Sequence, residues 1–343
     1  TYLVGEVVPM LPHRLSSGIC SLVENEDRLV KSVLFRFKED GTPIGAELAE
    51  CVIRSDKRLT YEQAILFLRG KSLEQIKREK PPPSRYSGNP GKSLSELPDE
   101  TLKEINLAIQ RLWSIASKLR LARMKAGSLD LESPDVKILV NAKGEPDRIL
   151  QMENDESHQL IEEFMLLANQ TVAKKLRQRK IPGIFRVHPE PDPENLDELR
   201  NFLAIFGISC GDLTSRKEVN KMLRAINKHP LAQVLRIKFL RSMKQACYRH
   251  TPDGHYGLAM NDYLHFTSPI RRYADLMVHR AVESDLAGQK PNRKLKQKLE
   301  GLAKHLSITE RNSVDAERES TKDKLLLFYK RDIGKQPPVK HRA

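Results

Sequence analysis

The segment that most restricts the possible folds is residues 294–334, which contain no proline and only two glycines, Gly301 and Gly334. Glycine and proline are the residues least compatible with the interior of a helix. A stretch of this length predicts one or two helices that are longer than the usual helix of a globular protein. The C-terminal half of the chain is therefore expected to be rich in helix.

Six further segments place apolar residues at the three- and four-residue spacing of an amphipathic helix. They are residues 59–70, 97–127, 157–178, 193–207, 215–229 and 230–248. Gly70 and Gly127 stand where the first two helices should end, because glycine readily adopts the left-handed conformation that closes a helix. Ser157 is predicted to cap the N-terminus of the third helix.

Strands are predicted early and in the middle of the chain. The segments are residues 33–37, 46–54, 135–141, 144–152 and 183–192. Asp40-Gly41 and Gly144 supply turn residues for two hairpins. Residues 78–97, which include three consecutive prolines from Pro81, are predicted to form a loop or insertion. Strands and hairpins in the first half and helices in the second indicate an α+β (mixed α/β) class.

The chain is strongly basic, with a formal net charge of +14 and a pI of about 9.5. This balance favours a polyanionic partner, most often nucleic acid and sometimes a membrane surface, although a protein can also be simply basic. No run approaches the 18 apolar residues of a membrane span, so we expect none. A single Trp and 6% aromatic residues exclude an aromatic-rich platform for single strands.

Cys20, Cys51, Cys210 and Cys247 are far apart and form no CxxC or Cys/His pair. This spacing argues against a thiolate metal site and a disulfide framework, and predicts free thiols in a reducing cytoplasm. The chain opens at Thr1 without a starting Met or a signal pattern, so we expect a fragment of a longer protein.

Residues 265–280, HFTSPIRRYADLMVHR, concentrate hydrogen-bond donors before an apolar segment. Ser268 is predicted to cap a helix in which Pro269 takes the first position, where its missing N–H costs nothing. Such a helix start attracts anions. Arg271 and Arg272 add guanidinium groups, each of which can donate two parallel hydrogen bonds to phosphate oxygens. This end of the helix is therefore predicted to hold a phosphate.

Two further donors, His265 and Thr267, lie on the approach to that helix and are candidates for the same site. The alternative is a surface helix in which Arg271 and Arg272 pair with Asp275, four and three residues further on.

Residues 254–280 closely resemble the signature of the ribonuclease II/ribonuclease R (RNB) family of 3′-to-5′ exoribonucleases, and within it the bacterial ribonuclease R branch. Other blocks resemble family blocks in the family's order: residues 7–29, 160–169, 184–191, 240–248 and 308–320. The resemblance covers residues 2 to about 334. It implies that residues 1–334 are a partial RNB catalytic domain and that residues 335–343 are a linker toward an S1-like RNA-binding domain.

The resemblance also implies roles for single residues. Arg271 falls where the family grips the scissile phosphate, and Tyr2 where a tyrosine stacks on the 3′-terminal nucleotide. Leu131 falls at the opposing clamp position, an aromatic in some members, and is otherwise a core residue. Glu163 and Glu317 match acidic residues near the terminal nucleotide and the active centre, and are otherwise ordinary helix-surface charges.

The family's metal site is an Asp-x5-Asp-x-Asp-Asp cluster that would lie upstream of Thr1, so no metal ligand is expected in this chain. Mg²⁺ or Mn²⁺ would bind there, since these ions prefer carboxylate oxygens and two of them stabilise the oxygens of phosphodiester hydrolysis. The candidates within the chain are isolated: Asp155, Glu156, Asp192, Asp197 and Asp253. The fragment alone is expected to be inactive.

The function that the resemblance implies is processive hydrolysis of single-stranded RNA from the 3′ end to nucleoside 5′-monophosphates by two-metal chemistry. A cytoplasmic monomer that binds neither DNA nor membranes is expected. The alternative is a non-catalytic RNA-binding member of the family that has lost its metal cluster. An aspartate cluster upstream of Thr1 would separate the two.

Overall fold

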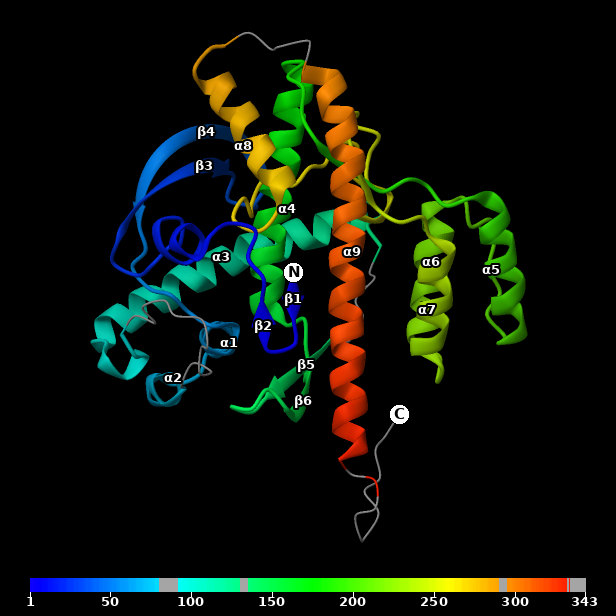
Figure 1. Cartoon of the computed structure of the whole chain (residues 1–343), viewed down its shortest axis with the longest axis horizontal. Coiled ribbons are helices and arrows are strands. Elements are labelled where there is room, and N and C mark those ends of the chain that lie inside the picture. The colour runs from blue at the N-terminus through cyan, green and yellow to red at the C-terminus, as the bar shows by residue number, and fades with distance from the viewer. Residues whose placement is uncertain (80–91, 130–134, 290–294, 332, 334–343) are drawn as a thin grey trace.

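The computed structural model describes the whole chain except residues 80–91, 130–134, 290–294, 332 and 334–343. Helices dominate the described part, and its strands form small two-stranded antiparallel sheets. The second half is mostly helical, whereas the hairpins lie in the first half and at mid-chain (Figure 1). The predicted α+β class with a helix-rich C-terminal half is confirmed.

Two of the strand pairs in the described residues, within 27–54 and 135–152, are the predicted hairpins, and two were not predicted. The strand pairs are β1 (Tyr2–Leu3) with β2 (Glu6–Val7), β3 (Asp27–Phe37) with β4 (Pro43–Arg54), β5 (Asp135–Val140) with β6 (Pro146–Met152), and β7 (Phe185–Val187) with β8 (Cys247–Arg249). Gly41 and Gly144 make the turns of two hairpins at φ +83° and +78°, a conformation that most other residues avoid.

Nine α-helices and a π-helix (Arg14–Ile19) lie in the described residues, beside two 3-10 turns, Leu94–Glu96 and Tyr256–Leu258. The α-helices are α1 (Tyr61–Leu68), α2 (Leu73–Arg78), α3 (Asp99–Lys125), α4 (Glu156–Gln178), α5 (Pro193–Ile205), α6 (Arg216–Asn227), α7 (Ala232–Ser242), α8 (Tyr273–Leu286) and α9 (Leu295–Lys330). Of the predicted loop at 78–97, residues 80–91 lie outside the described part; Arg78 ends α2 and Leu94–Glu96 form a short helical turn. None of the described helices is long and apolar enough to cross a membrane.

The structure corrects the predicted boundaries of α4 and α7. The cap of α4 is Asp155, whose Oδ1 accepts hydrogen bonds from the main-chain N–H of Ser157 (3.0 Å) and of His158 (3.3 Å). An N-cap side chain must precede the first helical residue to accept these N–H groups. Asp155 does so, whereas Ser157 lies inside the first turn. The predicted helix at 230–248 stops at Ser242, because Cys247–Arg249 pair with β7 as strand β8.

Helix α9 is a single helix of 36 residues, about 54 Å long at 1.5 Å per residue. It runs along the molecule and packs against β1, β5, β6, β8 and α8 (Figure 1). One helix therefore touches elements from both ends of the described chain and from its middle.

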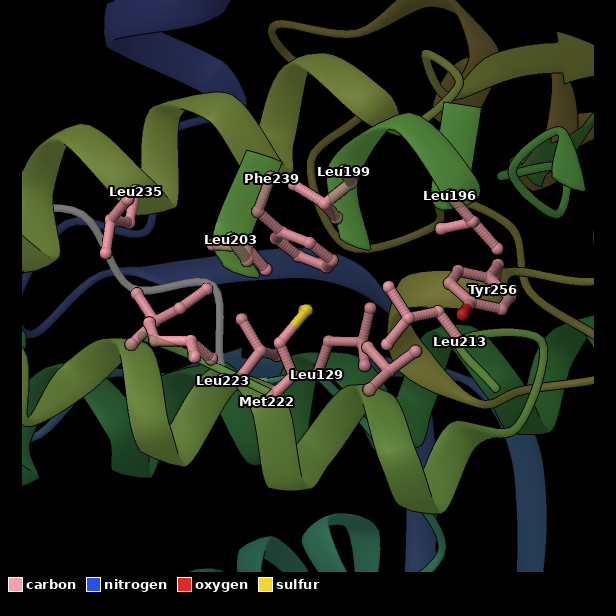
Figure 2. Packing of buried hydrophobic residues seen from close by; sticks show 13 residues of the cluster. Leu129, Leu196, Leu199, Leu203, Leu213, Met222, Leu223, Leu235, Phe239 and Tyr256 are labelled. Carbon is pink, nitrogen blue, oxygen red and sulfur yellow. The ribbon is translucent and has the colours of Figure 1, made fainter. Parts of the chain in front are cut away.

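Helices α5, α6 and α7 enclose a core of their own, which Figure 2 shows from close by. Leu203, Met222 and Phe239 from the three helices meet there, and all are almost fully buried. Tyr256, which belongs to the family-like signature segment, inserts into the same core. A second core joins α4 and α8 through Val172, Leu264 and Val278, among others. The signature segment thus lies between the two cores.

Candidate functional site

The segment that leads to the two arginines is fixed by buried side chains of α4 and α8. Asn169 of α4 donates from Nδ2 to Tyr263 Oη (3.2 Å) and accepts the main-chain N–H of Phe266 at Oδ1 (2.9 Å). His279 of α8 donates from Nε2 to the carbonyl of Phe266 (2.8 Å) and stacks on its ring. Because the two bonds of Asn169 are buried and that of His279 is partly buried, they fix the segment that approaches the arginines.

The predicted helix start is wrong in position. Helix α8 begins at Tyr273, with Arg272 as its cap residue, so Ser268 is no N-cap and Pro269 is not in the first helical turn. Residues 268–272 form a turn instead, in which the carbonyl of Ser268 accepts the main-chain N–H groups of Arg271 (3.2 Å) and Arg272 (3.1 Å). The arginines therefore precede the helix.

The cause of this shift is Asp275, in the first turn of α8. Its side chain is fully buried, and Oδ1 accepts the main-chain N–H of Ser268 (2.8 Å) and Arg272 Nη2 (2.8 Å). This carboxylate holds the main chain of Ser268 against the N-terminus of α8, and residues 268–272 do not continue the helix. The positive end of the helix is thus met by a carboxylate of the chain itself.

The two arginines differ in their surroundings. Arg272 is 19% exposed and paired with Asp275, as the alternative of a charge-paired helix predicted for it. Arg271 is exposed, and its guanidinium makes no hydrogen bond or ion pair with any described residue. The hydroxyl of Thr267 is buried and also has no partner among the described residues. Arg271 is therefore the group of this turn that is available to an anion.

Aromatic rings and imidazoles lie beneath the turn. Tyr248 Oη and His265 Nδ1 are hydrogen-bonded at 3.0 Å, and the ring of Tyr263 lies 5.7 Å from that of His265 and 5.2 Å from that of His255. Burial, reinforced by the positive charge of Arg272, holds the pKa of His265 well below its usual value. Burial and the neighbouring His188 lower the pKa of His255 to about 3.

Burial also raises the pKa of Tyr248 to about 12. At neutral pH these rings are consequently uncharged, so the charge at the turn comes from the arginines and the single carboxylate of Asp275.

Tyr2 and Glu317, predicted as site residues from opposite ends of the chain, are in direct contact. The main-chain N–H of Tyr2 donates to Glu317 Oε1 (2.8 Å), and that of Val4 donates to Ser320 Oγ (3.0 Å). Glu317 and Ser320 are three residues apart on α9 and therefore face the same way. The side chain of Tyr2 is 49% exposed, so its ring is accessible while its main chain is fixed.

Glu163 is buried and has a cationic partner inside the protein. Its side chain is 3% exposed, and both carboxylate oxygens accept from Arg123 Nε at 3.2 Å. Arg123 also donates to Ser128 Oγ (2.8 Å), whose hydroxyl donates to the carbonyl of Gly257 (3.3 Å). Glu163 thus connects α3 and α4 to the signature segment. Leu131 lies outside the described residues.

Several residues of the site are not among those predicted from the sequence. Arg186 of β7 lies 4.8 Å over the ring of Tyr248 and pairs with Glu310 of α9 at 2.5 Å. This contact connects the rings beneath the arginine turn to the helix that holds Tyr2. Arg186 and Tyr248 lie in sequence blocks that resemble the family, and this resemblance could have predicted them as site residues. Asn169 lies in such a block as well, at the end of residues 160–169, although an isolated amide in a helix has no pattern of its own.

No three carboxylates, histidines or cysteines come together as a possible metal site within the described ranges. The residues present therefore do not fit the two-metal centre that the family resemblance implies. Among the described residues, Arg271 is an exposed arginine on an anchored turn with neutral rings close by, and Tyr2 is an exposed tyrosine held by α9. A guanidinium of this kind suits a phosphate, and an accessible tyrosine ring suits a base.

This fold belongs to a known class of domain, which the comparisons identify. The model of the RNB domain matches residues 1–288. Ribonuclease R of Thermotoga maritima is 37% identical over 341 residues, which cover 97% of this chain and 44% of that protein. The chain belongs to the RNB-domain family.

Solved structures agree in fold. The RNase R of Mycoplasma genitalium, in complex with ribose-methylated single-stranded RNA, aligns with a TM-score of 0.83 at 29% identity over 97% of this chain and 50% of that one. The yeast pseudonuclease Ssd1 aligns with a TM-score of 0.67 at 20% identity, over 92% of this chain and 36% of that one, a likeness of fold alone. The chain thus spans half or less of each of these proteins.

Proposed function

We propose that this chain is the phosphate- and nucleotide-holding part of the catalytic domain of a 3′-to-5′ exoribonuclease of the ribonuclease R type. One observation carries the proposal: Arg271 presents an exposed guanidinium without a partner among the described residues, on a turn that buried groups anchor. The relatives named ribonuclease R support the activity, although this chain covers under half of the Thermotoga protein.

In the proposed reaction, each part of the site has one task. Arg271 holds the scissile phosphate, because a guanidinium can donate two parallel hydrogen bonds to its oxygens. Tyr2 stacks on the 3′-terminal base, a contact that tolerates every base and so suits an enzyme that degrades any sequence. Glu317 keeps the main chain of Tyr2 on α9. His265, Thr267, Ser268 and Arg272 shape the approach to Arg271.

Two assignments are less direct. Glu163 is proposed to act near the terminal nucleotide through the fold, because its carboxylate is already engaged by Arg123. Leu131 is proposed as apolar packing against that nucleotide. The divalent ions of the family, Mg²⁺ or Mn²⁺, would need ligands outside this chain, and no step is assigned to them. We further propose a monomer that works in the cytoplasm on single-stranded RNA.

The experiment uses a single-stranded RNA with a 5′ fluorophore and a DNA of the same sequence. The full-length protein that carries this sequence should shorten the RNA from its 3′ end with Mg²⁺ or Mn²⁺, release nucleoside 5′-monophosphates, and leave the DNA intact. The chain alone should bind the RNA without cutting it. If the full-length protein binds RNA but never shortens it, the alternative of a non-catalytic RNA-binding module is correct.

A further inference from the structure

The turn that presents Arg271 is anchored by one buried oxygen. Asp275 Oδ1 accepts both the main-chain N–H of Ser268, where the turn begins, and Nη2 of Arg272, where it ends, each at 2.8 Å. The side chain of Asp275 is fully buried. A carboxylate that served only as the counter-ion of Arg272 would not need the bond to Ser268.

The bond to Ser268 reaches Arg271 through the main chain. The carbonyl of Ser268 accepts the N–H of Arg271 at 3.2 Å, so the residue that Asp275 holds is also the residue on which the turn closes. The guanidinium of Arg271 makes no hydrogen bond or ion pair with Asp275. Its side chain is exposed, and only its main chain is fixed. The direction of Arg271 therefore depends on the turn.

We propose that Asp275 is a positioning residue for phosphate binding: it sets the direction in which Arg271 meets the phosphate without touching the phosphate itself. The inference rests on the proposed function, in which Arg271 is the phosphate ligand. A donor that is already oriented loses less conformational entropy when its ligand binds, and it keeps the geometry that the reaction requires.

The variants separate this anchoring from simple ion pairing. D275L/R272M replaces the pair with two apolar residues of similar size, a change that buried pairs often tolerate, and removes the acceptor for Ser268. R272M alone keeps the acceptor. D275N keeps an oxygen at Oδ1 and is the conservative variant. D262N is the matched control, because Asp262 is another buried carboxylate, paired with Arg177 at 2.7 Å.

The first measurement is hydrogen exchange of the Ser268 and Arg271 amides by NMR, without RNA. In D275L/R272M both amides should exchange at least about tenfold faster, as expected for loss of a buried hydrogen bond to a charged group. D275N should stay within about threefold of the wild type, and D262N should not change these amides. Unchanged exchange in a folded D275L/R272M overturns the inference. If that variant does not fold, D275E, which displaces the carboxylate by one methylene, gives the same test.

The second measurement is the salt dependence of binding to a fluorescent single-stranded RNA. Loss of one phosphate contact lowers the slope of log K against log salt by about 0.7. D275L/R272M should lose about this much relative to R272M, and adding R271A to it should cause no further loss. Equal slopes for R272M and D275L/R272M contradict the positioning role. Failure of the wild-type chain to bind RNA contradicts the proposed function instead, and the exchange of the turn amides then decides the anchoring by itself.

Discussion

The main-chain N–H of Tyr2 donates to Glu317 Oε1 at 2.8 Å, a hydrogen bond between residues separated by 315 positions in the sequence. The bond leaves the ring of Tyr2 half-exposed and ties its main chain to α9. In this structure Glu317 acts on the backbone of Tyr2, and the nucleotide site of the proposed function depends on that contact.

Glu317→Ala should therefore weaken binding of a single-stranded RNA by about tenfold, the value of one hydrogen bond to a charged group. Glu317→Gln keeps an acceptor for Tyr2 and should lose little. Fluorescence anisotropy measures both, with Glu319→Ala as the control, since Glu319 is an exposed residue of the same helix. An RNA whose 3′-terminal nucleotide lacks its base should bind wild type and Glu317→Ala equally; a persisting difference would show that Glu317 does not act through Tyr2.

Arg271→Ala in the full-length protein should lower turnover far more than RNA affinity. A donor aimed at the reacting phosphate contributes mainly in the transition state, and removing one such donor costs about 100- to 1000-fold in rate. Affinity should fall by less than about tenfold, since many phosphates contribute to it. Single-turnover rates and equilibrium binding separate the two effects. Arg280→Ala, at an exposed arginine within α8, should change neither the rate nor the affinity. An unchanged rate for Arg271→Ala would refute the assignment.

Glu163→Ala should destabilise the fold by about 3–5 kcal/mol, because it leaves Arg123 as a buried charge without its main counter-ion. The neighbouring Glu162 is 38% exposed, and Glu162→Ala should cost at most about 1 kcal/mol. Urea unfolding of each variant gives the free energies. A cost below about 1 kcal/mol for Glu163→Ala, combined with weaker RNA binding, would instead show that this carboxylate serves the ligand directly.

The free energy of unfolding should decrease as the pH falls from about 6.5. Burial lowers the pKa of His188, His255 and His265 in the folded protein. Below the unfolded pKa of about 6.5, the unfolded chain takes up protons that the folded chain refuses, so acid favours unfolding. Each histidine contributes up to about 1.4 kcal/mol per pH unit, and for His255 this continues toward pH 3.

Urea unfolding at pH 7.0 and 5.5 measures this slope. His255→Asn should lower the slope by the uptake of up to about one proton on unfolding. His305→Asn, at an exposed histidine of α9, should leave the slope unchanged. Equal slopes for wild type and His255→Asn would mean that His255 takes up a proton in the folded state.

Local patterns predicted most of the elements. The spacing of apolar residues in α3 and the turn glycines at 41 and 144 are properties of neighbouring residues, and the structure confirms them. Two boundaries were wrong because contacts beyond helix periodicity decided them: Cys247 joins a strand 60 positions earlier, at Val187, and Asp275, seven residues further on, binds the main chain of Ser268. No propensity of the local sequence contains these contacts.

The candidate site divides in the same way. The signature around Arg271 and the position of Tyr2 were found by resemblance, which reports residues but not their partners. The pairing of Glu163 with Arg123, and of Tyr2 with Glu317, appears only when helices far apart in the sequence pack together. Likewise, that Arg272 is paired and Arg271 is exposed became clear only from the position of the Asp275 carboxylate.

The hydrogen bonds between residues 2–4 and α9 also imply an order of events during synthesis. Ser320 and Glu317 are translated more than 300 residues after Val4 and Tyr2, which they hold. Until α9 has left the ribosome, the first strand has no partner on that helix. The main chain of Tyr2, the residue proposed to bind the end of an RNA, is therefore fixed only after α9 has been synthesised. Until then the nascent chain, which is still attached to its messenger RNA, lacks a complete nucleotide site.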